Sequence, residues 1–314
     1  MDHSSLAVHF YSMPLRTRFR GIDVREGVLV RGPGGWGEFS PFLDYGPPAT
    51  ARWWAAAEEA ATVGWPAPLR DLIPVNVTVP AVGPEQAAQI VRDSAGCRTA
   101  KVKVAERGQS LADDLDRVAA VRDVLGSDGR IRVDANAAWD VDGAVRAIRA
   151  LDRFTLEYVE QPCPTLEELA AVRRRVDVPL AADESVRTAE DPLRIAGLEA
   201  ADIVVLKVQP LGGVLRALEV AEACGLPVVV SSALETSVGI AAGVALAAAL
   251  PELPYACGLA TVQLLTSDVC SRPLLPADGA LPVRRPEPDL LDAVRADPAT
   301  TRRWQQRLAA ARDS

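Results

Sequence analysis

The chain has 314 residues, of which 49% are hydrophobic and 24% charged, and its formal net charge is −8. This length allows one large barrel or two ordinary domains, and the hydrophobic content excludes global disorder. The net negative charge argues against nucleic acid or an anionic membrane as the main partner.

Cysteine, histidine and apolar content exclude further classes of protein. Five scattered cysteines without a Cys-x-x-Cys spacing indicate neither a disulfide framework nor a zinc ribbon, so we expect reduced thiols and a cytoplasmic location. The two histidines, His3 and His9, lie near the start, which leaves acid–base chemistry to other side chains. Residues 1–14 do not resemble a signal peptide, and the longest apolar run, Val238–Leu250, is too short to cross a bilayer. We therefore expect no membrane insertion.

The first 70 residues predict a small antiparallel unit followed by a helix. Short apolar runs over residues 7–42 alternate with glycine-rich turns, and an alanine-rich helix is expected over 49–63. At the other end of the chain, a proline-rich tail from residue 273 precedes a charged helix, Pro298–Arg312, which we expect to pack back onto the N-terminal unit. The predicted domains are therefore a cap over 1–70, completed by about 273–314, and a barrel over 71–272.

From Ile73 onward, short apolar runs alternate with helical segments. The strand candidates are Ile73–Val79, Thr99–Val104, Arg130–Asp134, Leu156–Glu160, Pro179–Asp183, Asp202–Lys207, Pro227–Ser231 and, more weakly, Tyr255–Gly258. The helix candidates are residues 84–95, 110–126, 139–152, 165–175, 189–196, 212–224 and 237–250. Eight strands alternating with helices fit an α/β fold with a closed parallel barrel better than an open doubly wound sheet.

The strand Thr99–Val104 carries two lysines on one face. Lys101 and Lys103 alternate with Val102 and Val104, and side chains two apart on a strand point the same way. A neighbouring cation and partial burial both disfavour the protonated form of a lysine. The pattern therefore predicts a lysine that acts as a neutral base near pH 7.

Three consecutive strands after this one end in carboxylates, Asp134, Glu160 and Asp183, and the next ends in Lys207. Catalytic groups of such barrels lie at the carboxyl ends of the strands, so we expect these side chains to converge. Three carboxylates would repel one another unless a cation lay between them, and oxygen ligands suit Mg²⁺ or Mn²⁺. Removing one acid should then leave the stability of the metal-free protein unchanged or raised.

These residues resemble a known family. Lys101-Val-Lys103, Val133–Trp139, Glu160-Gln-Pro162, Ala182–Ser185 and Leu206–Gly213 are similar to the enolase superfamily, in its subgroup related to muconate lactonising enzymes. The resemblance implies a modified TIM barrel, (β/α)₇β, with an α+β capping domain formed by both termini.

The resemblance also implies a role for each residue of the constellation. Asp134, Glu160 and Asp183 would bind Mg²⁺, with Mn²⁺ as a possible substitute. Lys103 would be the base and then the proton donor, Lys101 would tune the pKa of Lys103, and Lys207 would face the opposite side of a small-molecule carboxylate substrate.

Further segments resemble one branch of this subgroup, a dehydratase that serves menaquinone biosynthesis. These segments are Arg16–Gly21, Gly35–Phe42, Ser231–Gly239 and Gly258–Thr261. In that branch Lys103 would remove the proton α to the carboxylate of 2-succinyl-6-hydroxy-2,4-cyclohexadiene-1-carboxylate, and water would leave by syn elimination. Lys207 would then lie against the ring as a cation. Two alternatives stay open: an N-acylamino acid racemase or dipeptide epimerase, which needs both lysines as bases, and a non-catalytic barrel.

Five further residues are candidates for substrate binding. Asn136 could touch the substrate or the metal ligands. Ser231, Ser232 and Gly258 could hold the succinyl carboxylate, or could be turn residues only. Arg20, in a predicted cap loop, could recognise the anionic end of the substrate or be a solvated charge. The sequence leaves the oligomeric state open.

Overall fold

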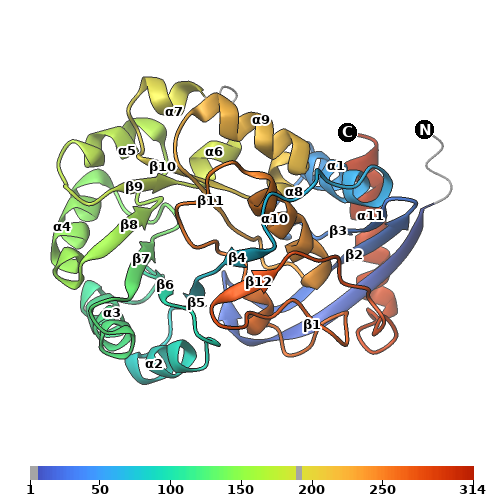
Figure 1. The fold of residues 1–314 in the computed structure, drawn as a ribbon, viewed down its shortest axis with the longest axis horizontal. Helices are drawn as coiled ribbons and strands as arrows, with labels where there is room; N and C mark the ends of the chain where they lie inside the picture. Colours follow the sequence, from blue (N-terminus) through green and yellow to red (C-terminus); the bar gives the residue numbers. More distant parts are fainter. Residues whose placement is uncertain (1–5, 189–192) are drawn as a thin grey trace.

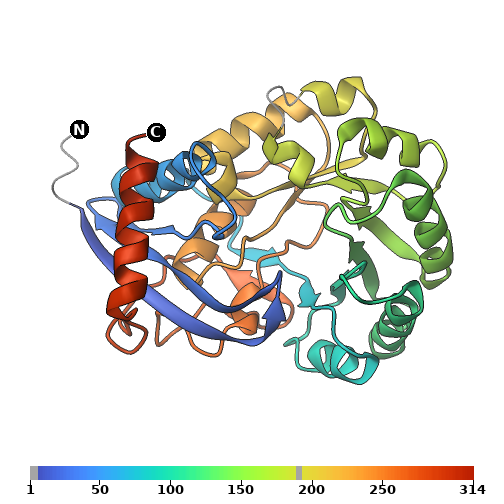
Figure 2. The same ribbon diagram turned by 180° about the vertical axis from the view of Figure 1, so that it is seen from behind.

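The computed structural model describes residues 6–188 and 193–314, and Figure 1 shows a curled parallel sheet surrounded by helices beside a smaller antiparallel unit. The smaller unit contains β1 (Ala7–Phe19), β2 (Ile22–Gly32) and β3 (Gly35–Phe39), paired antiparallel in that order, and α1 (Ala49–Thr62). The last helix, α11 (Pro298–Arg312), packs against α1 and β1, as the view from behind also shows (Figure 2). Both ends of the chain therefore build this unit, as expected.

The tip of the β1–β2 hairpin is a tight turn. Phe19 pairs with Ile22, and the two residues between them, Arg20 and Gly21, have positive φ angles of 49° and 78°. Two such residues in a row match the right-handed twist of the flanking strands. The turn carries Phe19 and Arg20 to the pocket described below.

The parallel sheet has the order β11-β10-β9-β8-β7-β6-β5. Its strands are β5 (Val77–Val79), β6 (Thr99–Lys103), β7 (Arg130–Asp134), β8 (Leu156–Glu160), β9 (Leu180–Ala182), β10 (Ile203–Leu206) and β11 (Val228–Val230). The predicted eighth strand at Tyr255–Gly258 is present as two isolated parallel bridges, Val75 to Cys257 and Ser231 to Gly258, which link the two edges of the sheet. The modified barrel predicted from the sequence is therefore confirmed.

The predicted strand Ile73–Val79 is in fact two short strands. Its first part, β4 (Leu72–Pro74), leaves the barrel and pairs antiparallel with β12 (Ala280–Pro282), while its second part is β5. The tail after residue 273 thus returns to the barrel as well as to the smaller unit. The predicted domain boundaries at 70/71 and 272/273 stay a prediction.

The helices follow the predicted alternation. They are α2 (Pro84–Arg92), α3 (Leu111–Leu125), α4 (Val141–Leu151), α5 (Leu166–Arg173), α6 (Glu184–Thr188), α7 (Leu193–Gly197), α8 (Val208–Leu211), α9 (Val214–Cys224) and α10 (Ser237–Ala249), with 3₁₀ turns at Asp152–Phe154 and Thr261–Leu264. The sequence pattern did not predict α6 and α8. Half of the predicted helix 189–196, residues 189–192, lies outside the described residues, and α7 covers the other half. Among the described residues, no helix is long and apolar enough to span a membrane.

The lower part of the barrel interior is filled with side chains. Tyr158, Ala181, Ile203, Val205 and Val229 form a separate apolar cluster. Beside it the guanidinium of Arg132 is completely buried, stacks on Tyr158 at 4.7 Å and bonds to Glu157. Because side chains fill the interior, a site can form only above it, at the carboxyl ends of the strands.

Candidate active site

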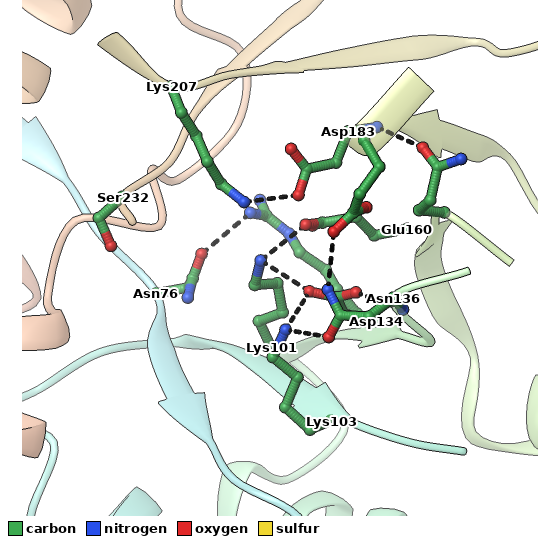
Figure 3. Close-up of polar contacts among 12 residues, drawn as sticks. Asn76, Lys101, Lys103, Asp134, Asn136, Glu160, Asp183, Lys207 and Ser232 are labelled. Atoms are coloured by element: carbon green, nitrogen blue, oxygen red, sulfur yellow. Dashed lines mark hydrogen bonds and ion pairs between the residues drawn. The ribbon is translucent and has the colours of Figure 1, made fainter. Parts of the chain in front are cut away.

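The structure brings together the six charged residues predicted from the sequence. Strand pairing sets Lys103 beside Asp134 and Asp134 beside Glu160, while Asp183 and Lys207 directly follow β9 and β10. Figure 3 shows the three carboxylates as a row that Lys103 and Lys207 approach from opposite ends. Period-2 alternation, which points Lys101, Lys103 and the acids into the barrel, accounts for this convergence.

Each carboxylate is paired with a lysine. Lys101 Nζ lies 2.8 Å from Glu160 Oε1 and 3.1 Å from Asp134 Oδ2, and Lys103 Nζ lies 2.6 Å from the same Asp134 oxygen. Lys207 Nζ lies 2.5 Å from Asp183 Oδ2. The acids are fully buried, and a buried charge is costly unless it is paired. In this site the charges of three ammonium groups compensate those of the three carboxylates. The sequence predicts a cation among the acids, and in this structure the lysines of the neighbouring strands supply that positive charge.

Burial and these pairs shift the pKa values of the cluster. Burial works against the charge on Lys101, but Glu160 and Asp134 outweigh it and raise the pKa of Lys101 well above its usual value. Burial opposes the charge on Asp134 too, yet Lys103 and Lys101 hold the pKa of this carboxyl well below its usual range. Burial and the charge of Asp134 raise the pKa of Glu160 to about 7, although Lys101 acts in the other direction. Lys101 is thus favoured as a cation, and the predicted neutral base stays assigned to Lys103 by the resemblance alone.

The chemical nature of the three acidic side chains suits the binding of a divalent cation. Three carboxylates from neighbouring strands offer oxygen ligands, and Glu160 Oε2 is a buried oxygen without a hydrogen-bond partner. As the side chains stand, no three His, Cys, Asp or Glu residues in the described ranges converge on one point, since the acids are turned toward the lysines. Binding an ion therefore requires the ammonium groups to release the carboxylates.

Gln161 joins two of the acid-bearing loops, a role that the sequence reasoning missed. Its side-chain oxygen accepts hydrogen bonds from the backbone N–H groups of Asp183 (2.8 Å) and Ser185 (3.2 Å). Its side-chain nitrogen donates to Ser185 Oγ at 2.6 Å and to the carbonyl of Cys163 at 2.8 Å. The side chain is fully buried and fixes the loop after Glu160 against the loop that carries Asp183.

Asn136 contacts the cluster directly. Its Oδ1 accepts a hydrogen bond from Lys103 Nζ at 2.6 Å, and its backbone N–H donates to Asp134 Oδ1 at 3.0 Å. Its Nδ2 donates to Glu184 at 3.2 Å. Asn136 therefore orients Lys103 and Asp134, while its contact with substrate stays a prediction.

A pocket lies above the charged row, and all five candidate substrate-binding residues line it: Arg20, Asn136, Ser231, Ser232 and Gly258. The sequence reasoning missed its other walls, which are Phe19, Phe42, Thr78, Ala233, Leu234 and Thr261. Phe19 could have been found, because it lies between Arg18 and Arg20 in a segment already singled out. Its ring is 5.4 Å from Lys103 Nζ.

Arg20 and Ser232 already have partners within the protein. Arg20 stacks on Phe42 at 4.5 Å and donates to the Tyr45 hydroxyl at 3.3 Å. Ser232 Oγ lies 2.7 Å from Thr261 Oγ1, so these two hydroxyls form one polar edge of the pocket.

A compositional signal also marks the site. The chain has only three lysines, and all three lie here, whereas its other basic side chains are arginines. An arginine cannot lose its proton under physiological conditions, whereas a lysine can. Lysine is thus confined to the place where an amine can take up a proton.

Comparisons with known proteins agree with this geometry. The protein-family model described as "Enolase C-terminal domain-like" matches residues 84–288 of the chain, and the family model "Enolase N-terminal domain-like" matches residues 10–61. The o-succinylbenzoate synthase of Thermobifida fusca (strain YX) is 71% identical over 304 residues, which are 96% of this chain and 95% of that protein. The chain belongs to the o-succinylbenzoate synthases of the enolase superfamily.

Other matches support this assignment. The o-succinylbenzoate synthase of Mycolicibacterium smegmatis is 54% identical and covers 96% of this chain and 94% of that protein. The solved L-Ala-D/L-Glu epimerase from Bacillus subtilis is 25% identical with a TM-score of 0.78, over 91% of this chain and 97% of the epimerase. A muconate lactonizing enzyme from Pseudomonas fluorescens shares the fold at 23% identity and a TM-score of 0.80, over 93% and 98% of the two chains. As an o-succinylbenzoate synthase, the protein is a carbon–oxygen lyase, and its superfamily indicates use of a divalent cation.

Proposed function

We propose that this enzyme dehydrates 2-succinyl-6-hydroxy-2,4-cyclohexadiene-1-carboxylate to 2-succinylbenzoate in menaquinone biosynthesis. The observation that carries the proposal is the 71% identity to a named o-succinylbenzoate synthase over nearly the whole chain. The substrate has a carboxylate on a ring carbon, an acidic hydrogen on that same carbon, and a hydroxyl on the neighbouring ring carbon. A site with carboxylates and amines in one row suits such a molecule.

Lys103 is the proposed base and acid. Its free amine takes the proton from the carbon α to the ring carboxylate, and the electron pair left behind forms the new ring double bond as the C–O bond breaks. The resulting ammonium then returns that proton to the departing hydroxyl, so that one water leaves and the ring becomes aromatic. Lys103 is the most exposed of the three amines, with 15% of its side chain accessible, and it lines the pocket.

We propose Mg²⁺ as the cofactor, with Mn²⁺ as a substitute, held by Asp134, Glu160 and Asp183. When bound, the ion supplies positive charge for the substrate carboxylate as negative charge develops next to it. Lys101, held by Glu160 and Asp134, places a second positive charge beside the proposed base Lys103. Lys207 presents a cation to the other side of the ring.

The remaining pocket residues are proposed to bind the succinyl chain. Ser231, Ser232 and Gly258 offer hydroxyl and backbone N–H groups to its carboxylate, and Arg20 contributes positive charge from the cap. We also propose that the enzyme works in the cytoplasm, which suits its five scattered and buried cysteines.

The test is a direct assay of the cyclohexadiene carboxylate with Mg²⁺. We expect formation of the aromatic product by the wild type and a loss of turnover in Lys103→Ala. A second candidate, racemisation of N-acylamino acids, is favoured by the two lysines at opposite ends of the row. Exchange of the α-hydrogen of an N-acylamino acid in D₂O with inversion, without turnover of the cyclohexadiene, would replace the first proposal by the second.

A further inference from the structure

Arg25, on β2 of the cap, binds the barrel although it does not line the pocket. It is 2% exposed, and its Nε donates to the carbonyl of Leu234 at 2.7 Å, while its Nη2 donates to the carbonyl of Ala233 at 3.2 Å. The same Nη2 donates to Ser40 Oγ at 2.8 Å and to the Ser40 carbonyl. One guanidinium thus ties the end of β3 to the loop after β11.

The groups held by Arg25 are walls of the substrate pocket. Ala233 and Leu234 line the pocket from the barrel side, and Phe42 lines it from the cap side. The Phe42 ring stacks on the Arg25 guanidinium at 4.7 Å. Leu234 has a φ of +64°, a conformation that a leucine adopts only when its surroundings impose it. The bond from Arg25 to the Leu234 carbonyl supplies such a constraint.

A second cap residue holds the other end of the same loop. Glu38, on β3, accepts hydrogen bonds from the backbone N–H of Thr236 at 3.1 Å and from the Thr236 hydroxyl at 2.5 Å, and also from Gly239 N–H at 3.0 Å. Gly239 allows this approach, since a Cβ there would lie 2.9 Å from Glu38 Oε2. Residues 233–236 are therefore fixed by the cap at both ends.

We propose that Arg25 is a positioning residue that shapes the pocket for the part of the substrate remote from the reacting carbon. By holding Ala233, Leu234 and Phe42 together it makes substrate binding depend on the docked cap. Arginine is required because its planar fork reaches three carbonyls outside its own strand, the carbonyl of Glu26 and a ring face at once, which the single ammonium of lysine cannot do. The substrate part of this proposal rests on the proposed function.

The test compares Arg25→Lys with a matched control, Arg70→Lys. Arg70 also clamps three carbonyls, those of Ala247, Leu250 and Pro251, but at the far end of α10. For Arg25→Lys we expect KM to rise and affinity for the aromatic product to fall about tenfold, with kcat within about threefold and Mg²⁺ affinity unchanged. Arg70→Lys should leave KM at the wild-type value.

A structural readout separates this proposal from the proposed function. Hydrogen exchange of peptides covering 233–236 should be about tenfold faster in Arg25→Lys and unchanged in Arg70→Lys, whether or not the cyclohexadiene is the substrate. Ser40→Ala, which removes one Arg25 bond and the bond that Ser40 donates to Glu38, should change exchange and KM in the same direction by a smaller factor. The positioning role would be overturned by unchanged hydrogen exchange in Arg25→Lys, or by an equal rise of KM in Arg70→Lys. If the wild type does not turn over the cyclohexadiene but the variants show the expected exchange pattern, only the proposed substrate would be overturned.

Discussion

Lys103 Nζ lies 2.6 Å from Asp134 Oδ2, so the amine proposed to take the substrate proton is bound to a carboxylate proposed to bind the metal. The same oxygen cannot serve the ammonium and a divalent ion equally well, because both require its negative charge. Metal binding should therefore release Lys103 for its catalytic role. This relationship leads to predictions about metal affinity, reactivity and stability.

Lys103→Ala should lower kcat/KM by about 10³-fold, the range expected for loss of a general acid–base group. Its affinity for Mg²⁺ or Mn²⁺ should equal or exceed that of the wild type, since no ammonium competes for Asp134. Titration calorimetry measures the affinity, and a turnover assay measures the rate. Loss of metal binding together with activity would show that Lys103 is needed to build the site, not to transfer a proton.

Among side chains, amine-selective reagents should modify this site alone, because the chain has three lysines and all of them lie there. The α-amino group of the chain also reacts, and its modification is assigned to the N-terminal peptide. Lys103, with 15% of its side chain exposed, should be modified before Lys101 at 7% and Lys207 at 8%. Peptide mass spectrometry identifies the modified residue, and activity should fall in step with modification of Lys103. Saturation with the aromatic product should protect it, and modification of Lys207 first would contradict the arrangement.

Asp134→Asn should destabilise the protein in the presence of a chelator by about 3 kcal/mol, because it removes the carboxylate of Lys103 and one of the two carboxylates that Lys101 contacts. This reverses the expectation from the sequence, which did not consider pairing with lysines. Chemical denaturation measures the difference. Asp142→Asn is the control, since Asp142 pairs with Arg175 at the surface and its loss should cost under about 0.5 kcal/mol. Equal stability of Asp134→Asn and the wild type would restore the original expectation.

Gln161→Leu should weaken metal binding by about 10- to 100-fold, the usual cost of losing a group that orients metal ligands. The leucine cannot replace the hydrogen bonds that join the loops of Glu160 and Asp183. Calorimetry of the variant beside Gln86→Leu, an exposed position whose side chain donates to Thr17 at 3.2 Å, measures the effect. A metal affinity like that of the control would mean that the strands alone set the ligand spacing.

The stability of the protein should depend on pH through Glu235. Burial, and then the charge of Glu38, raise the pKa of Glu235 from 4.5 to about 7. A raised carboxyl pKa means that the folded state binds the proton more tightly, so this stabilisation is complete below about pH 4.5 and is lost as the pH rises through 7. The difference corresponds to about 3 kcal/mol.

Glu235→Gln should remove this dependence between pH 4.5 and 7. Urea unfolding at several pH values measures it, with Glu252→Gln, at an exposed position, as the control. A slope in Glu235→Gln equal to that of the wild type would assign the pH dependence to another group, and Glu38, whose pKa is also raised by burial, would be the next to test.

The charged row could be predicted because each member is fixed by local periodicity. Lys101, Lys103, Asp134 and Glu160 follow from strand alternation and from the rule that parallel strands end at one edge. What each carboxylate contacts could not be predicted, since the sequence does not show side-chain rotamers or the distance between neighbouring strands. The pairing of Lys101 with Glu160 therefore emerged only from the structure.

The pocket walls were harder to predict because they come from distant parts of the chain. Leu234 becomes a wall only when Arg25, 209 residues earlier, binds its carbonyl. Phe42 likewise acquires its position by stacking on Arg20 and Arg25. The two-part strand over Leu72–Val79 has a similar cause, since β4 pairs with β12 near the end of the chain. Such long-range partners leave no local pattern in the sequence.

Helix α11 has a consequence for the pocket, although it lies outside it. Trp304 is buried, lies edge-on to Phe39 with ring centroids 6.0 Å apart, and donates to Glu26 at 3.0 Å. The strands that carry Arg25 and Glu38 thus gain their outer cover from a residue that lies 278 positions beyond Glu26. Loosening this helix should therefore weaken substrate binding without any change at the pocket itself.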